Sequence, residues 1–138
     1  MEKFIAVSVS LLSDVELGLD ERELKDYAKL RFKNSFAAIK FDRELSESVF
    51  EDFPPEEKDA VHGVIMFRVW TVGTDYPIAY HISIMAGTLG PGYYNPDRHT
   101  NAYLGNCSKT DLMDVVKESI DSLMEDFAIE FFKARGEL

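Results

Sequence analysis

The sequence predicts an α+β fold in which two main helices pack on one face of a mostly antiparallel sheet of about five strands. Apolar residues alternate with polar ones in several short stretches, and two other stretches place apolar residues at steps of three and four. The two longest strand-like stretches are separated only by a short turn. These observations give the expected order β-α-β-β-β-β-α. Because we find neither an internal repeat nor a linker, residues 1–138 are expected to form a single domain.

The first expected elements are a strand and a helix. Apolar and small polar residues alternate over residues 5–11, which is the period of a half-buried strand. Asp20 then precedes Glu23 by three positions, so Asp20 is expected to cap the Glu23 amide while the Glu23 side chain reaches back to Asp20. The helix is expected to end at residues 34–35. Its stripe contains Leu24, Tyr27, Ala28, Arg31 and Phe32.

The centre of the chain is expected to connect this helix to a long hairpin. A short strand is predicted at residues 39–41, where apolar and charged residues alternate. The acidic stretch from Glu44 to Asp59 contains Pro54 and Pro55, which indicates an exposed connection. Within it, residues 45–53 carry apolar side chains at helical spacing, which is typical of a short helix.

The hairpin is expected to consist of strands at residues 61–72 and 78–86, joined by a four-residue loop at 73–76. The pairing that follows sets Thr71 opposite Ile78, Val69 opposite Tyr80, Phe67 opposite Ile82, and Ile65 opposite Ile84. This pairing gives one almost wholly apolar face, which is expected to share a core with the two helices. The second face is mixed and carries His62, Val64, Met66, Arg68, Trp70, Ala79, His81, Ser83 and Met85.

The C-terminal part is expected to contain a long loop, a strand and a long helix. Glycine and proline residues punctuate residues 87–100, which predicts the loop, and the fifth strand follows at residues 101–106. Ser108 and Asp111 form a second capping-box pattern, and the helix is expected to end at Gly136. Its apolar residues are Leu112, Val115, Val116, Ile120, Leu123, Met124, Phe127 and Phe131.

The net charge excludes several classes of partner, and the cysteine content leaves the compartment open. Cys107 is the only cysteine, so no intramolecular disulfide can form. Acidic residues outnumber basic ones by 25 to 15, and a net charge of -10 repels nucleic acid and anionic membranes. No stretch approaches the roughly 20 apolar residues of a transmembrane helix. The apolar N-terminus superficially resembles a signal peptide, but Asp14 and Glu16 intervene and no cleavage-like site follows. The sequence therefore leaves the compartment unknown: cytoplasmic as written, and periplasmic or envelope-associated if an export leader has been removed.

The layout resembles a group of small uncharacterised bacterial α+β proteins that are often exported. The residues that carry this resemblance are Leu17-Gly18-Leu19-Asp20, which lead the first helix through Phe32, and the aromatic-rich segment from Glu125 to Phe132. The resemblance implies the same fold and no catalytic residues. An envelope location is implied only where an export signal is present.

Catalytic and metal sites find little support in the pattern of residues. Cys107 precedes an expected helix N-terminus, where backbone dipoles lower the pKa of a thiol, and His81 or His99 would be its base. No family-specific Cys-His signature is present, so a structural or incidental cysteine is the favoured interpretation. The three histidines lack metal-ligand spacing, and no lysine follows the glycines after Gly87 as a phosphate-binding loop requires. We predict no cofactor and no metal.

The sequence instead favours a noncatalytic interaction or ligand-binding module. The predicted binding residues come from the mixed hairpin face and the glycine-rich stretch: Met66, Arg68, Trp70, His81, Met85, Tyr93, Tyr94 and His99. Because the mixed face is too apolar to stay exposed, we predict a homodimer through it, with a protein or small molecule as the other possible occupant. The alternative function is an acidic inhibitor, immunity or chaperone-like partner of a basic protein, and a Cys107-dependent enzyme is a third hypothesis.

Overall fold

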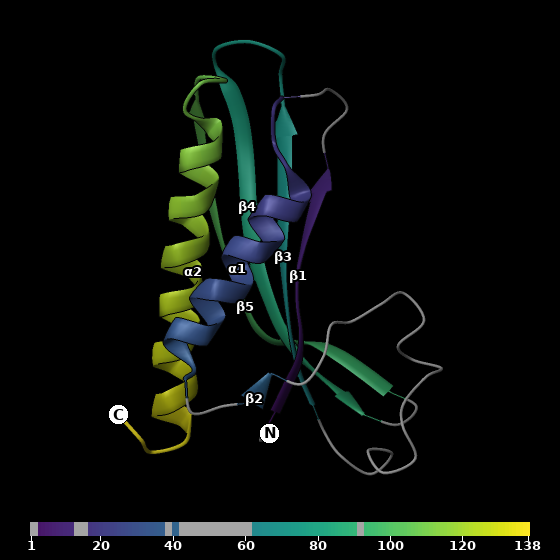
Figure 1. Cartoon of the computed structure of the whole chain (residues 1–138), viewed down its shortest axis with the longest axis vertical. Coiled ribbons are helices and arrows are strands. Elements are labelled where there is room, and N and C mark those ends of the chain that lie inside the picture. Colours follow the sequence, from purple (N-terminus) through teal and green to yellow (C-terminus); the bar gives the residue numbers. More distant parts are fainter. Residues whose placement is uncertain (1–2, 13–16, 38–39, 42–61, 91–92) are drawn as a thin grey trace.

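The computed structural model describes residues 3–12, 17–37, 40–41, 62–90 and 93–138. The elements in these residues follow the predicted order and are shown in Figure 1. They are β1 (Lys3–Leu12), α1 (Glu21–Ser35), β2 (Lys40–Phe41), β3 (His62–Val72), β4 (Ile78–Gly90), β5 (Tyr93–Cys107) and α2 (Leu112–Ala134). The acidic stretch from Glu44 to Asp59, including the short helix considered within it, lies outside the described residues.

The strands form one mixed sheet in the spatial order β2-β1-β3-β4-β5. Its two longest ladders, β3 with β4 and β4 with β5, are antiparallel, whereas β1 pairs in parallel with both β3 and β2. Parallel neighbours need a long crossover connection, and the chain between β1 and β2 supplies one through α1. Since β2 is only two residues long, four strands carry most of the sheet. The predicted α+β class is confirmed.

The hairpin register differs from the prediction by two residues. Thr71 lies opposite Tyr80, and Phe67 lies opposite Ile84. The predicted register would have required Pro77 to pair opposite Val72, but proline has no N–H to donate to a ladder. The turn therefore includes Pro77, and β4 begins at Ile78, as predicted. Because side chains alternate with a period of two, a shift of two residues leaves every side chain on its predicted face.

The long loop predicted at residues 87–100 is wrong. β4 continues to Gly90, and β5 begins at Tyr93, so most of this stretch is paired strand. Glycine and proline suggested a loop, but the ladder to β4 satisfies the backbone of these residues. The pairing does shift between Ala86, which faces His99, and Thr88, which faces Asn95. Pro96 lies within the three residues that this shift leaves out of the ladder, as expected for a residue without an N–H.

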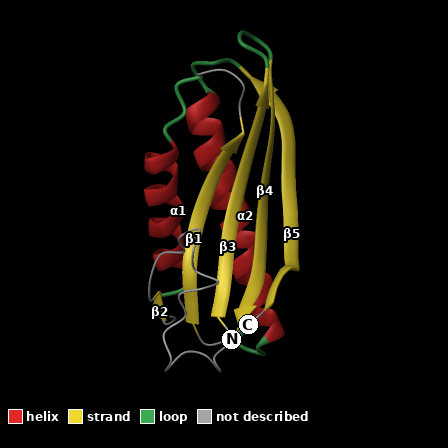
Figure 2. Ribbon diagram, turned by 90° about the vertical axis from the view of Figure 1, so that its right-hand side faces the viewer, coloured by secondary structure: helices red, strands yellow, loops and turns green. Residues whose placement is uncertain are grey.

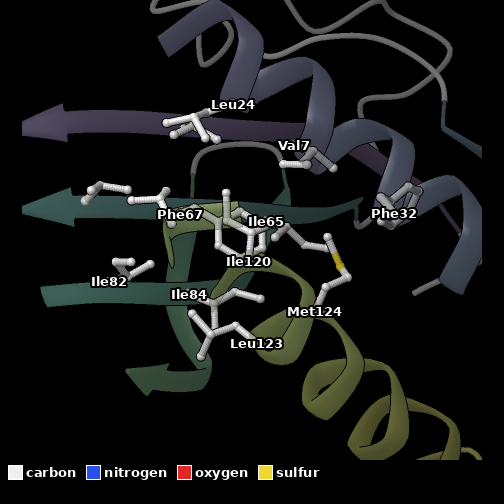
Figure 3. Packing of buried hydrophobic residues seen from close by; sticks show 14 of the residues in the cluster. Val7, Leu24, Phe32, Ile65, Phe67, Ile82, Ile84, Ile120, Leu123 and Met124 are labelled. Atoms are coloured by element: carbon white, nitrogen blue, oxygen red, sulfur yellow. The ribbon is translucent and has the colours of Figure 1, made fainter. Parts of the chain in front are cut away.

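The hydrophobic core lies between the sheet and the two helices, which cover the same face of the sheet (Figure 2). From the sheet, β1, β3 and β4 contribute alternate residues, among them Val7, Ile65 and Ile82. From the helices, α1 contributes Leu24, Ala28 and Phe32, and α2 contributes a stripe that includes Ile120, Leu123 and Met124 (Figure 3). The expected core residues are confirmed, with Tyr27 at its margin.

The start of α1 and the end of α2 lie where they were predicted, whereas α2 starts later than predicted. The Asp20 carboxylate accepts hydrogen bonds from the amides of Arg22 and Glu23, at 3.0 and 3.1 Å. At α2 the helix begins later than expected, because the hydroxyl of Ser108 closes a preceding turn by accepting from the Asp111 amide at 3.2 Å. At the other end, Gly136 has a φ of 72°, and the amide of Glu137 donates to the Phe132 carbonyl, which completes a Schellman cap.

A polar seam holds α1 against α2 at the surface. The Tyr27 hydroxyl donates to Asp121 at 2.7 Å, and Arg31 pairs with the same carboxylate at 2.8 Å. Lys117 donates to Glu23 at 2.9 Å, so the Glu23 side chain, which was expected to complete a capping box, contributes to the contact between helices. Hydrogen bonding to Glu23 raises the pKa of Lys117, which keeps this lysine charged.

Candidate functional site

The helices leave one face of the sheet without a described helix over it, and this outer face is the candidate site. Strand side chains alternate between two faces, so the residues between the core positions point to the outer face. β1 contributes Ser10 and Leu12, and the cross-strand partners continue the face onto β3, β4 and β5. The described members are Ser10, Leu12, Val64, Met66, Arg68, Trp70, Val72, Ala79, His81, Ser83, Met85, Thr100, Ala102, Leu104 and Asn106.

One row of this face crosses four strands and contains three exposed large apolar side chains. Leu12 pairs with Trp70, Trp70 with His81, and His81 with Leu104. Trp70 is 51% exposed and Leu104 is 80% exposed. Val72, in the neighbouring row, is 74% exposed. Singly exposed apolar residues are ordinary, whereas several of them close together on one face are typical of interaction surfaces.

Exposure on the outer face is graded along the strands. Val64 is buried, Met66 and Met85 are half-buried, and Trp70 is exposed. The indole of Trp70 lies 6.4 Å from the His81 ring, measured between centroids, in a tilted arrangement. The apolar surface is therefore concentrated at the end of the face where β3 and β5 finish and β4 begins.

The described part of the outer face contains no aspartate or glutamate, although the chain has 25 acidic residues. The charge on it is Arg68. Depletion of charged residues is the compositional mark of the buried centre of a protein interface, and tryptophan, methionine and arginine are enriched there. Most of the acidic side chains lie on the helices or in the chain outside the described residues, and the others are Asp20, Asp75, Asp97, Asp111 and Glu137.

The structure brings together five of the eight predicted binding residues. Met66, Arg68, Trp70, His81 and Met85 all lie on the outer face. His99 lies on the opposite face, where its Nδ1 is 2.6 Å from Glu130 of α2 and its ring packs on Phe127. Tyr93 and Tyr94 pair with Gly90 and Leu89 at the start of β5, and their side chains lie outside the described residues.

Sequence reasoning missed three apolar members of this face. Leu12, Val72 and Leu104 are each more than 40% exposed. Their place in the alternation of their strands marks them as outward-facing, and this signal was available for all three. What the sequence lacked was the order of the strands, which places Leu12 from β1 beside Trp70 and Leu104 from β5 beside His81.

The surroundings of Cys107 oppose its activation as a nucleophile. It ends β5, five residues before α2 begins, and is half-buried against the core. Burial raises the pKa of the thiol, and the negative charge of Asp111 raises it further. The expected lowering by the helix N-terminus is therefore wrong, because the helix starts at Leu112 and an acidic residue stands between the helix and the thiol.

We predict that Cys107 reacts with iodoacetamide more slowly than a model thiol over roughly pH 7 to 9. A raised pKa means a smaller thiolate fraction at each pH, so the alkylation rate should rise only at higher pH than for the free thiol. Asp111→Asn should move the profile part of the way back, because burial remains. A Cys107 rate equal to that of the model thiol across the range would contradict the raised pKa.

Two shallow grooves border α2. One lies between α2 and α1, has a volume of about 440 Å³, and is lined by Arg31, Asn34, Ser35, Asp121, Met124 and Glu125. The other lies between α2 and β5, has a volume of about 300 Å³, and is lined by Tyr80, Tyr103, Leu104, Val115, Glu118, Ser119 and Ser122. Within the residues that the structure describes, no group of three or more histidine, cysteine, aspartate or glutamate side chains is arranged to hold a metal ion.

Comparison with known proteins identifies the fold. No family model matches the chain, and no curated protein matches its sequence. Three solved bacterial proteins are similar in structure. A dodecameric PelC variant from Paraburkholderia phytofirmans matches at 11% identity and a TM-score of 0.53, over 90% of this chain and 88% of that one. A neuraminyllactose-binding hemagglutinin homolog from Helicobacter pylori matches at 8% identity and a TM-score of 0.56, over 94% and 82%.

The third is a minor lipoprotein from Acinetobacter baumannii, with 10% identity and a TM-score of 0.41 over 93% of this chain and 94% of that one. None of the described helices is both long and apolar enough to cross a membrane. The predicted resemblance to bacterial α+β proteins is thus confirmed at the level of fold. At these sequence identities, the chain shares an architecture with the first two proteins, and that shared architecture is what the comparisons establish.

Proposed function

We propose that this protein is a noncatalytic interaction module and that its outer sheet face binds a second copy of the same chain. The observation that carries the proposal is the row of Leu12, Trp70 and Leu104, which is exposed across the sheet. Burying such side chains removes apolar surface from water, which is the main favourable term in protein association.

The charge distribution makes the outer face the part of the described surface best suited to a second copy. Two copies of a chain with a net charge of -10 repel each other through most of their surfaces. The described outer face is an exception, because its charge comes from Arg68 and not from carboxylates. A two-fold dimer also requires only that one patch be complementary to itself. The PelC variant, which is similar in fold, forms a dodecamer, and this supports the proposal of self-association.

The test is to replace Trp70 with glutamate and to measure the mass in solution. The parent chain is expected to be dimeric at about 100 μM, which is in the weak-association range. Trp70→Glu places an unpaired charge in a desolvated contact and should shift the protein to monomer at the same concentration. Multi-angle light scattering measures the mass, and far-ultraviolet circular dichroism should show unchanged helix content.

Leu30→Glu is the matched control. Leu30 lies on α1, on the helical side of the molecule, and its exposed fraction of 54% is close to the 51% of Trp70. The two variants therefore carry the same added charge at equally exposed apolar positions. Leu30→Glu should remain dimeric. A monomeric parent chain, or equal loss of the dimer in both variants, would rule out the outer face as the dimer interface.

A further inference from the structure

β5 forms one border of the sheet, and its outer edge has no strand partner among the described residues (Figure 2). β5 is 15 residues long, from Tyr93 to Cys107, and pairs with β4 along its inner side. An edge strand of this length presents a row of backbone N–H and C=O groups, which is the template that an added strand uses. This edge adjoins the outer face proposed for the dimer, and the two surfaces share residues of β5.

The side chain of Asn101 identifies which backbone groups point outward. Its Oδ1 accepts a hydrogen bond from the Ala102 amide at 2.8 Å. An amide bonded in this way is not the one that pairs with β4, so Ala102 faces the edge. In an antiparallel ladder such residues alternate, and the backbone groups of Ala102, Leu104 and Asn106 therefore point toward the open edge.

A row of four residues on α2, three of them acidic, follows the same edge. Glu118, Ser122, Asp126 and Glu130 are spaced four apart and so lie on one side of the helix. Each has a link to β5. Glu118 and Ser122 line the groove with Tyr103 and Leu104.

The remaining two carboxylates of this row bond directly to β5 side chains. Asp126 accepts from the Tyr103 hydroxyl at 3.3 Å, and Glu130 lies 2.6 Å from His99. We call Glu118, Asp126 and Glu130 the acidic ridge. It runs antiparallel to β5, because the residue numbers rise along α2 as they fall along the strand. A strand added to β5 would therefore place one set of its side chains beside three carboxylates.

The floor of the groove between β5 and α2 is shaped for contact with an added chain. Gly105 pairs with Tyr80, whose hydroxyl would lie 2.5 Å from a Cβ at this position. The absence of a side chain at Gly105 thus lets the Tyr80 ring lie across β5 and reach the groove. The groove combines the Tyr80 and Tyr103 rings with the Glu118 carboxylate, which suits the aliphatic stem and charged end of lysine or arginine.

We infer that the β5 edge binds an extended basic segment of another protein by strand addition, with its lysine or arginine side chains directed to the acidic ridge. The backbone edge supplies the hydrogen bonds, and the ridge selects the charge. A second copy of this chain does not suit the edge, because pairing of two β5 strands would bring two acidic ridges together. In the free protein the Asn101 Oδ1 accepts a hydrogen bond from the Ala102 amide, and an acceptor on the added strand replaces it on binding.

The probe is a fluorescein-labelled peptide of alternating lysine and valine, roughly nine residues long, which is the length of an ordinary strand. Fluorescence anisotropy should show saturable binding at about 20 mM salt, and affinity should fall at least about tenfold at about 200 mM salt. The same peptide with glutamate in place of lysine should not bind.

Separate variants test the contributions of the acidic ridge and of the β5 backbone edge to peptide binding. Glu118→Lys should weaken binding about fivefold or more, whereas Glu125→Lys, with the same charge change on the α1 side of α2, should leave it nearly unchanged. Ala102→Pro removes an outward-facing N–H without removing a bond to β4, and it should abolish saturable binding while circular dichroism stays unchanged. As a second route to the same test, a peptide with alternate backbone amides N-methylated should fail to bind the parent protein.

Several results would overturn the inference. These are no saturable binding at low salt, equal binding of the glutamate peptide, or equal losses in Glu118→Lys and Glu125→Lys. Unchanged binding by the N-methylated peptide would exclude strand addition. A dimer that is lost in Ala102→Pro but kept in Trp70→Glu would show that β5 pairs with a second copy instead. Trp70→Glu should leave peptide binding intact, so failure of the dimer proposal remains distinguishable from failure of this one.

Discussion

Replacing Phe127 with alanine is expected to lower the free energy of unfolding by about 3 to 5 kcal/mol. Phe127 is 5% exposed and belongs to the core between α2 and the sheet. Its ring contacts Phe36, with centroids 5.6 Å apart, and the His99 ring, with centroids 5.1 Å apart. The substitution removes this buried surface and leaves a cavity between rigid elements. Urea denaturation should show a lower midpoint with an unchanged slope.

Ile129→Ala is the matched control for Phe127. Ile129 lies two residues further along α2 and is 39% exposed, so truncation there removes little buried surface. Its free energy of unfolding should change by no more than about 1 kcal/mol. If Phe127→Ala and Ile129→Ala shift the urea midpoint equally, the assignment of the buried face of α2 is wrong.

Replacing Phe36 with alanine is expected to have an effect of similar size, about 3 to 5 kcal/mol. Phe36 follows the last residue of α1, is 1% exposed, and lies at the centre of an aromatic cluster. Its ring centroid is 4.9 Å from that of Phe32, 5.3 Å from that of Phe131 and 5.5 Å from that of Phe132. The cluster joins the C-terminal ends of the two helices, so its loss should also loosen their contact.

Two further variants test why Phe36 stabilises the fold. Phe36→Leu keeps an apolar side chain at the site and should cost less than about 1.5 kcal/mol if volume rather than ring stacking dominates. Because Phe36 and Phe127 are in contact, the double alanine variant should deviate from additivity by at least about 0.5 kcal/mol. Additive effects would show that the two rings contribute to separate parts of the core.

The predicted α+β layout held because it rested on periodicity and turn chemistry, which act locally. Alternation predicted β1, β3 and the start of β4, and the three- and four-residue steps predicted both helices. Asp20 and Gly136 marked helix ends because each acts on backbone groups only a few residues away. The Asp20 carboxylate accepts hydrogen bonds from amides of the first turn of α1, and the positive φ of Gly136 allows the cap at the end of α2. The two faces of the β3–β4 hairpin were also predictable, since an error of two residues in register does not move a side chain to the other face.

Other features needed the tertiary structure. Glycine and proline between Gly87 and Thr100 predicted a loop, but pairing with β4 overrides local preference there and extends both strands. The same extension places His99 against Glu130 on the helical side, away from Trp70. Cys107 was predicted to sit beside a helix N-terminus, whereas the turn at Ser108 delays the helix and leaves the thiol next to Asp111.

Local patterns in the sequence were enough to predict the fold class, the core-facing residues of the elements and the mixed character of the hairpin face that carries Trp70. These follow from the spacing of neighbours along the chain. Contacts between distant segments were needed to see that Leu12 and Leu104 extend that face, and that Glu118, Asp126 and Glu130 follow the open edge of β5. Strand order and helix placement depend on such contacts, which local periodicity does not encode.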